Sequence, residues 1–200
     1  MSIFTDIKAE VSQRCISNGL AANEAFCEII TEKLKDAGVI DEFSPCHFDQ
    51  TIDGRRIKID GYAISDDLSK LELFISSYDS DAEDLSVKKI EIKKIRQLQK
   101  LADEFYQYAL LIRSNSYNEE SELFEIINYI KQSAKKLEFL RVHILGDGYY
   151  TENYNVYSSN RKGMGYTYTC ELWDANSLKT VFSDEGFVEN NIEIDVNKFS

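Results

Sequence analysis

Two acidic residues on neighbouring predicted strands are the strongest candidates for chemistry in this chain. Asp60 lies in the strand that follows the Asp53-Gly54 turn, and Glu72 lies in the next apolar strand. Two or three carboxylates at one edge of a sheet can hold Mg²⁺, which activates water and offsets charge on a scissile phosphate. Glu28, on a predicted helix, is the candidate third oxygen ligand. This pattern is typical of metal-dependent phosphodiesterases.

A catalytic site of this kind also needs a lysine that positions the attacking water. The residues two and four positions beyond Glu72 are a phenylalanine and a serine, so the Glu-x-Lys motif is absent. Lys58 or Lys70 would have to replace that lysine. The structural alternative is that Asp60 caps the end of a strand and that Glu72 is a solvated edge residue. Carboxylates more than about 8 Å apart would exclude a shared ion, because its oxygen ligands lie at about 2.0–2.6 Å.

A basic stretch at residues 88–100 is a second candidate for binding. On a helix, its lysine and arginine side chains would cover one broad face that could bind phosphate or an acidic partner. An ordinary solvated helix face is the alternative. The candidate nucleic-acid-binding residues are Lys89, Lys93, Lys94 and Arg96.

The remaining polar motifs are less specific. The tyrosine-rich segment 149–168 could stack bases or form a hairpin with packed cross-strand pairs. His143, in an apolar strand, is expected to be a hydrogen-bonded core residue. His47 follows Cys46, and adjacent strand residues point to opposite faces, so a joint Cys–His site is not expected. The chain contains neither a GxSxG motif nor a P-loop.

The elements that position these residues follow from periodicity and turn chemistry. Apolar residues at helical spacing predict helices over 3–18, 21–37, 86–113 and 121–136, with Asn23 as a cap and Gly38 as a stop. Asp53-Gly54 predicts a hairpin turn, followed by a third strand in one antiparallel meander. In the strand after that turn, Ile57 and Ile59 should face one side, and Lys58, Asp60 and Tyr62 the other. Further strands are predicted at 139–145, 164–174 and 191–196.

This order predicts an α+β or mixed α/β fold, with a central sheet flanked by helices. We expect one domain over residues 1–200, with a helical start at 3–37, a sheet and helices at 46–145, and a β-rich end at 146–200.

Composition restricts the class of protein. The chain has 200 residues and a formal net charge of −12, so it lacks the cationic excess of a general duplex-DNA binder. No apolar run is long enough for a membrane span, and no secretory signal is recognisable, which predicts a cytoplasmic protein. Four cysteines without CxxC spacing predict reduced thiols.

Several segments together resemble the N-terminal region of the AIPR family, the bacterial abortive-infection phage-resistance proteins. The resemblance preserves order over nearly the whole chain, from EAFCEIITEKLKDAGVIDEF through IDGRRIKIDGYAISDDLSKLELFISSYD, LADEFYQYAL, LRVHILGDG and CELWDANSLKTVF to NIEIDV. Its most specific parts are the tripeptides Asp60-Gly61-Tyr62 and Leu172-Trp173-Asp174.

The resemblance implies a restriction-endonuclease-like fold, related to PD-(D/E)xK nucleases but with a degenerate motif. It also implies a role in antiphage defence and a C-terminal region of a longer protein as a partner. Two functions stay open: a nuclease-like scaffold used for sensing, binding or assembly, or an active Mg²⁺-dependent nuclease. The catalytic candidates are Asp60, Glu72 and Lys58, and the metal candidates are Asp60, Glu72 and Glu28. Nucleic acid, a phage component or a second copy of the chain are the candidate partners.

Overall fold

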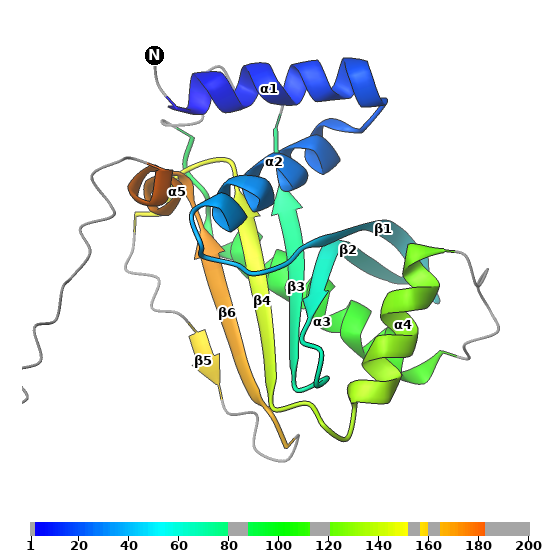
Figure 1. Cartoon of the computed structure of the whole chain (residues 1–200). Coiled ribbons are helices and arrows are strands. Elements are labelled where there is room, and N and C mark those ends of the chain that lie inside the picture. The colour runs from blue at the N-terminus through cyan, green and yellow to red at the C-terminus, as the bar shows by residue number, and fades with distance from the viewer. Residues whose placement is uncertain (1–2, 80–87, 113–120, 152–156, 160–164, 183–200) are drawn as a thin grey trace, which may run out of the picture.

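A mixed β-sheet lies between two layers of helices (Figure 1). The computed structural model describes residues 3–79, 88–112, 121–151, 157–159 and 165–182. Within these residues the sheet has the strand order β1-β2-β3-β4-β6-β5. The first three strands form an antiparallel meander, β4 and β6 run parallel to β3, and β5 is a short antiparallel edge. The strands are β1 Ser44–Ile52, β2 Arg55–Ile64, β3 Lys70–Ser77, β4 Phe139–Gly146, β5 Tyr157–Ser159 and β6 Thr167–Trp173.

The helices cover the two faces of the sheet separately. On one face, α3 and α4 share a hydrophobic core with apolar residues of β1 to β4 and β6. On the other face, α1, α2 and α5 form a second core that includes Phe74 of β3 and Leu145 of β4. The helices are α1 Ile3–Asn18, α2 Ala22–Asp36, α3 Ile92–Leu111, α4 Glu122–Ser133 and α5 Ala175–Phe182. None of the described helices is long and apolar enough to cross a membrane.

The predictions for the first half of the chain are largely confirmed. Asp53 and Gly54 both have positive φ angles, 50° and 75°, as expected for the turn between β1 and β2. Gly38, with φ of 68°, follows α2. Asn23 does not cap α2, because the N-cap residue is Ala21. The predicted mixed α/β fold is confirmed, whereas the predicted strand at 191–196 lies outside the described residues.

The period of two along β2 is broken at Gly61. Ile57 and Ile59 face the α3 side as predicted, but Tyr62 joins the same core instead of facing the other side with Asp60. β1 carries an extra residue at this level, since the pairing register shifts between Pro45 and Phe48. The backbone ladder is locally disrupted at such an irregularity, and it is at this level that Ile59 and Tyr62 of β2 come to share one face.

Gly61 also has a packing requirement. A Cβ atom at this position would lie 2.2 Å from Cε2 of Phe43 and 2.8 Å from the carbonyl oxygen of Ser44. Both distances are shorter than a real contact permits. The glycine of the Asp60-Gly61-Tyr62 tripeptide is therefore required for β1 and the segment before it to approach β2.

We predict that Gly61→Ala lowers the free energy of unfolding by about 1–3 kcal/mol, as overpacking does in a filled interior. Chemical denaturation measures the change. Gly38→Ala is the comparison, because Gly38 has positive φ but a Cβ added there would have nothing within 4 Å. The loss at Gly38 measures backbone strain alone, whereas an unchanged free energy of unfolding in Gly61→Ala would contradict the packing requirement.

Candidate functional site

The backbone ladder between β2 and β3 ends at the Gly61–Phe74 pair, and two side chains of β2 continue it. The Ser76 N–H donates to Oδ2 of Asp60 at 2.6 Å, and the Lys58 ammonium donates to the Ser76 carbonyl at 2.8 Å. A buried backbone group without a partner costs about 1–3 kcal/mol. These two side chains therefore allow β2 to separate from β3 while Ser76 stays fully hydrogen-bonded.

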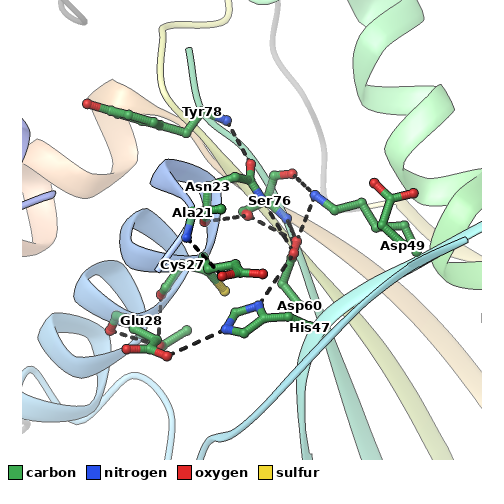
Figure 2. Close-up of polar contacts among 12 residues, drawn as sticks. Ala21, Asn23, Cys27, Glu28, His47, Asp49, Asp60, Ser76 and Tyr78 are labelled. Carbon is green, nitrogen blue, oxygen red and sulfur yellow. Dashed lines mark hydrogen bonds and ion pairs between the residues drawn. The ribbon is translucent and has the colours of Figure 1, made fainter. Parts of the chain in front are cut away.

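The two side chains also form a buried ion pair with each other. Nζ of Lys58 lies 3.0 Å from Oδ2 of Asp60, and the two residues are 9% and 2% exposed. The Ser76 hydroxyl donates to the same carboxylate oxygen at 3.0 Å. Figure 2 shows the donors converging on Asp60 from several elements. Oδ2 thus receives three donors, from Lys58 and from the backbone and side chain of Ser76.

The second oxygen of Asp60 connects the strand to α2 and β1. Asn23 of α2 donates from Nδ2 to Oδ1 of Asp60 at 3.3 Å, and its own Oδ1 accepts the Tyr78 N–H at 3.1 Å. Nδ1 of His47, in the bulge of β1, lies 3.8 Å from the same Asp60 oxygen. One carboxylate therefore links α2, β1, β2 and the end of β3.

His47 lies between two carboxylates. Its Nε2 is 3.5 Å from Oε1 of Glu28 on α2, while its Nδ1 faces Asp60. Cys46, the preceding residue, is instead buried in the core on the α3 side. The two neighbours thus point to opposite faces, as the sequence predicts.

The surroundings of these groups shift two pKa values in opposite directions. Burial alone would raise the pKa of Asp60, but the His47 ring, the Lys58 charge and the Ser76 N–H outweigh it, so this pKa is lowered. Burial lowers the pKa of His47, but the facing carboxylates of Asp60, Glu24 and Glu28 outweigh it, and this pKa is raised. The site therefore favours a charged imidazolium beside a charged carboxylate.

A cavity of about 500 Å³ opens where β2 separates from β3. Its wall includes His47, Lys58, Asp60 and Ser76, together with Lys94 of α3. This volume is within the range of small-molecule sites. The Asp60 cluster therefore borders a space that can accept a ligand.

Glu72, the second predicted catalytic carboxylate, lies elsewhere on β3. It is four residues before Ser76, about 13 Å along an extended strand. It is 4% exposed, its Oε1 lies 2.8 Å from Nζ of Lys70 and 3.6 Å from Nη1 of Arg141, and its Oε2 is 3.5 Å from Nε2 of His143. Burial alone would raise the pKa of Glu72, but His143 and Lys70 lower it to about 2. Glu72 is thus a buried, ion-paired residue.

His143 is a hydrogen-bonded core residue, as predicted. Nε1 of Trp173 donates to its Nδ1 at 3.0 Å, and its ring stacks on Phe74 with centroids 4.6 Å apart. Because Nδ1 accepts, the imidazole proton of the neutral ring is on Nε2, facing Glu72.

The predicted metal ligands are not brought together. Asp60 lies beside the carboxyl end of β3 and Glu72 near its other end, and Glu28 is separated from Asp60 by the His47 ring. No group of three or more His, Cys, Asp or Glu side chains among the described residues is arranged to hold a metal ion. The donor set that Mg²⁺ prefers, several free carboxylate oxygens, is therefore not assembled as the sequence predicts.

The predicted nucleic-acid-binding residues divide into two groups. Lys94 borders the cavity beside Asp60 and a second, adjoining cavity, which Lys89 also borders. Lys93 and Arg96 border neither of these two cavities. Lys94 and Lys89 thus border cavities, but Lys89 precedes α3, so the predicted helix over 86–113 is wrong at residues 88–91 and Lys89 does not lie on the predicted basic helix face.

Sequence reasoning did not assign a site role to Asn23 or Ser76. Asn23 is 37 residues from Asp60 along the chain, and no periodicity indicates that they meet. Ser76 could have been noticed in the sequence, because it lies four residues after Glu72, one of the positions where a nuclease lysine was sought.

A family model, that of the abortive infection phage resistance protein N-terminal domain, AIPR_N, matches residues 26–180. Comparisons with curated proteins and with solved structures find no significant match. The matched range contains Glu28, His47, Lys58, Asp60 and Ser76 but not Asn23.

Asp60→Asn should lower the free energy of unfolding by about 3–5 kcal/mol, because it leaves the buried Lys58 ammonium without its counter-charge. Urea denaturation measures this. Asp49→Asn is the matched control, since Asp49 pairs with Arg56 near the surface, where ion pairs contribute about 0–1 kcal/mol. The double variant Lys58→Met/Asp60→Asn should recover part of the loss. Equal losses at Asp60 and Asp49 would contradict the assignment.

The raised pKa of His47 predicts a stability difference that depends on pH. Its contribution is fully present below the unfolded pKa of about 6.5 and is lost as pH rises through the higher folded pKa. Wild type should therefore exceed His47→Gln in unfolding free energy by more at pH 6 than at pH 9. NMR titration can follow the ring directly, because the chain contains only 2 histidines. A difference that is the same at both pH values would contradict the charge pairing.

Proposed function

Because the chain belongs to the abortive infection phage resistance protein N-terminal domain family, we propose that it serves an antiphage protein as a nuclease-like scaffold that binds a ligand without hydrolysing it. The observation that carries the proposal is that both carboxylate oxygens of Asp60 already have protein hydrogen-bond donors. Its oxygens accept hydrogen bonds from Ser76 and Asn23 and pair with Lys58, so protein donors already occupy the positions that a metal would need. The cavity beside it provides the binding space.

The restriction-endonuclease-like scaffold is part of this proposal. Helices on both faces of a mixed sheet, with an acidic residue on β2 beside the end of β3, support it. Glu72 is followed two residues later by Phe74 and not by a lysine, which supports a scaffold that has lost hydrolysis.

An active Mg²⁺-dependent nuclease is the second candidate, and one contact favours it. Lys58 lies 3.0 Å from Asp60, and both residues border the cavity, so a lysine is present beside the acid although it comes from a different strand position. The two candidates differ in whether this pair acts on a substrate or only supports the strand.

Assembly is the other non-hydrolytic role open to such a scaffold. The large hydrophobic residues exposed among the described residues, Ile16, Leu111 and Phe139, lie on three different elements, α1, α3 and β4. A cavity beside charged groups is a stronger argument than three separate exposed residues. Ligand binding is therefore the favoured role.

We expect no cleavage of plasmid DNA, single-stranded DNA or RNA by the purified chain with Mg²⁺ above the level seen in EDTA. Asp60→Ala and Lys58→Gln are tested in parallel, and the lysine variant serves if the aspartate variant does not fold. Metal-dependent cleavage that either substitution abolishes would establish the nuclease instead. Metal-dependent cleavage unchanged by both substitutions would also contradict the expectation, and would place hydrolysis outside this site.

A further inference from the structure

The outward side of the first half of α3 carries cations at helical spacing. Lys93, Arg96 and Lys100 follow one another at intervals of three and four residues, and all three are exposed. Residues at these intervals lie on one side of a helix, about 4.5–6 Å apart along its axis. The buried residues of the same segment are Ile95, Leu98, Leu101 and Ala102. The three cations therefore point away from the core and together form the basic face of α3.

The basic face is not paired with acids of the chain. Cations elsewhere, such as Arg14 on α1 and Arg56 on β2, form ion pairs with nearby carboxylates. The three side chains of the basic face make no ion pair or hydrogen bond within the part of the chain that the structure describes. Residues 92–102 contain no acid, and Glu104, farther along α3, is paired with Arg55. The charge of the basic face is therefore uncompensated, although the chain as a whole is acidic.

The basic face also begins where a helix tolerates cations least. The N-terminal end of a helix carries partial positive charge, which repels cations in the first turn. The first turn of α3 contains Lys93 and Lys94 and no acidic residue, whereas those of α2 and α4 contain Glu24 and Glu122. Glu91 precedes α3 but makes no ion pair with either lysine. This charge distribution does not stabilise α3 by itself, and an anionic partner would offset it.

The chemistry of the basic face favours a protein carboxylate partner over a nucleic acid. The aromatic residues that follow it on α3, Phe105 and Tyr106, are buried, so α3 offers no exposed ring there for a base to stack on. The basic face spans about 10 Å, and a long polynucleotide requires many cationic contacts, which a chain of net charge −12 does not supply. Carboxylates repeated every three or four residues on a second helix match the spacing of the three cations.

We propose that the basic face of α3 is a docking surface for an acidic helical segment of a partner protein, whose carboxylates recur every three or four residues. Charge complementarity of this kind speeds encounter and selects the partner more than it adds affinity. The surface is separate from the cavity beside Asp60, because its three residues border neither that cavity nor the adjoining one. The inference therefore goes beyond the proposed function and does not depend on it.

Fluorescence anisotropy with the intact chain tests the proposal. The probe is a labelled synthetic helical peptide with glutamates at positions i, i+3 and i+7. It should bind saturably in about 0.01 M salt and more weakly in about 0.15 M salt, because salt screens exposed charges. The triple variant Lys93→Gln/Arg96→Gln/Lys100→Gln should weaken binding in low salt by about tenfold or more, as the loss of three exposed ion pairs would.

The matched control is a second triple variant, Lys135→Gln/Lys136→Gln/Lys179→Gln. It removes the same charge at three exposed lysines that also make no ion pair among the described residues. Its affinity for the peptide should change by less than about twofold. Circular dichroism checks that both variants keep their helices. Equal weakening by the two triple variants would show a response to net charge alone and would overturn the docking surface.

Two further probes test the class of partner. A peptide with the same glutamates placed on different sides of the helix should bind several-fold more weakly than the first. A single-stranded oligonucleotide that binds more tightly than the spaced peptide, and loses that binding in the α3 triple variant, would replace the protein partner with a nucleic acid. Absence of saturable binding by the spaced peptide in low salt would overturn the proposal.

Discussion

The structure around the site depends on how one residue, Ser76, satisfies its backbone. Its N–H and carbonyl face β2, but the partner groups are the side chains of Asp60 and Lys58 rather than the backbone of β2. This arrangement lets β2 diverge from β3, and the divergence opens the cavity. Because both charges are buried, neither can be removed alone without leaving the other unpaired. The ion pair and the cavity are therefore parts of one constraint.

A similar aspartate–lysine pair lies at the end of β3 on the side that faces β4. Asp147, after β4, accepts the Asp79 N–H through Oδ2, and that oxygen also pairs with Lys88. An aspartate–lysine pair thus terminates β3 towards β2 and another terminates it towards β4. The two pairs hold Lys58 and Lys88 against buried acids. The result is a polar recess at the end of β3 whose buried charges are paired with one another.

The sequence predicts the framework well because its determinants are local. The turn at Asp53 and Gly54, the helical apolar spacing and the alternation of Ile57 with Lys58 all depend on residues a few positions apart. It also identifies Asp60 and Lys58 as residues of interest. The sequence does not indicate which residues far apart along the chain contact one another. The bulge that brings His47 to Asp60 and the contact with Asn23 depend on three-dimensional packing, so the sequence pattern groups Asp60 with Glu72 although the geometry separates them.

The net charge of −12 affects large and small anions differently. Exposed acidic groups repel a polyanion as a whole, because a long nucleic acid must approach many of them at once. Beyond a Debye length of about 8–10 Å, however, salt screens these groups from a small ligand inside a recess. Global acidity therefore disfavours a duplex as a whole without excluding a small anion in a local recess.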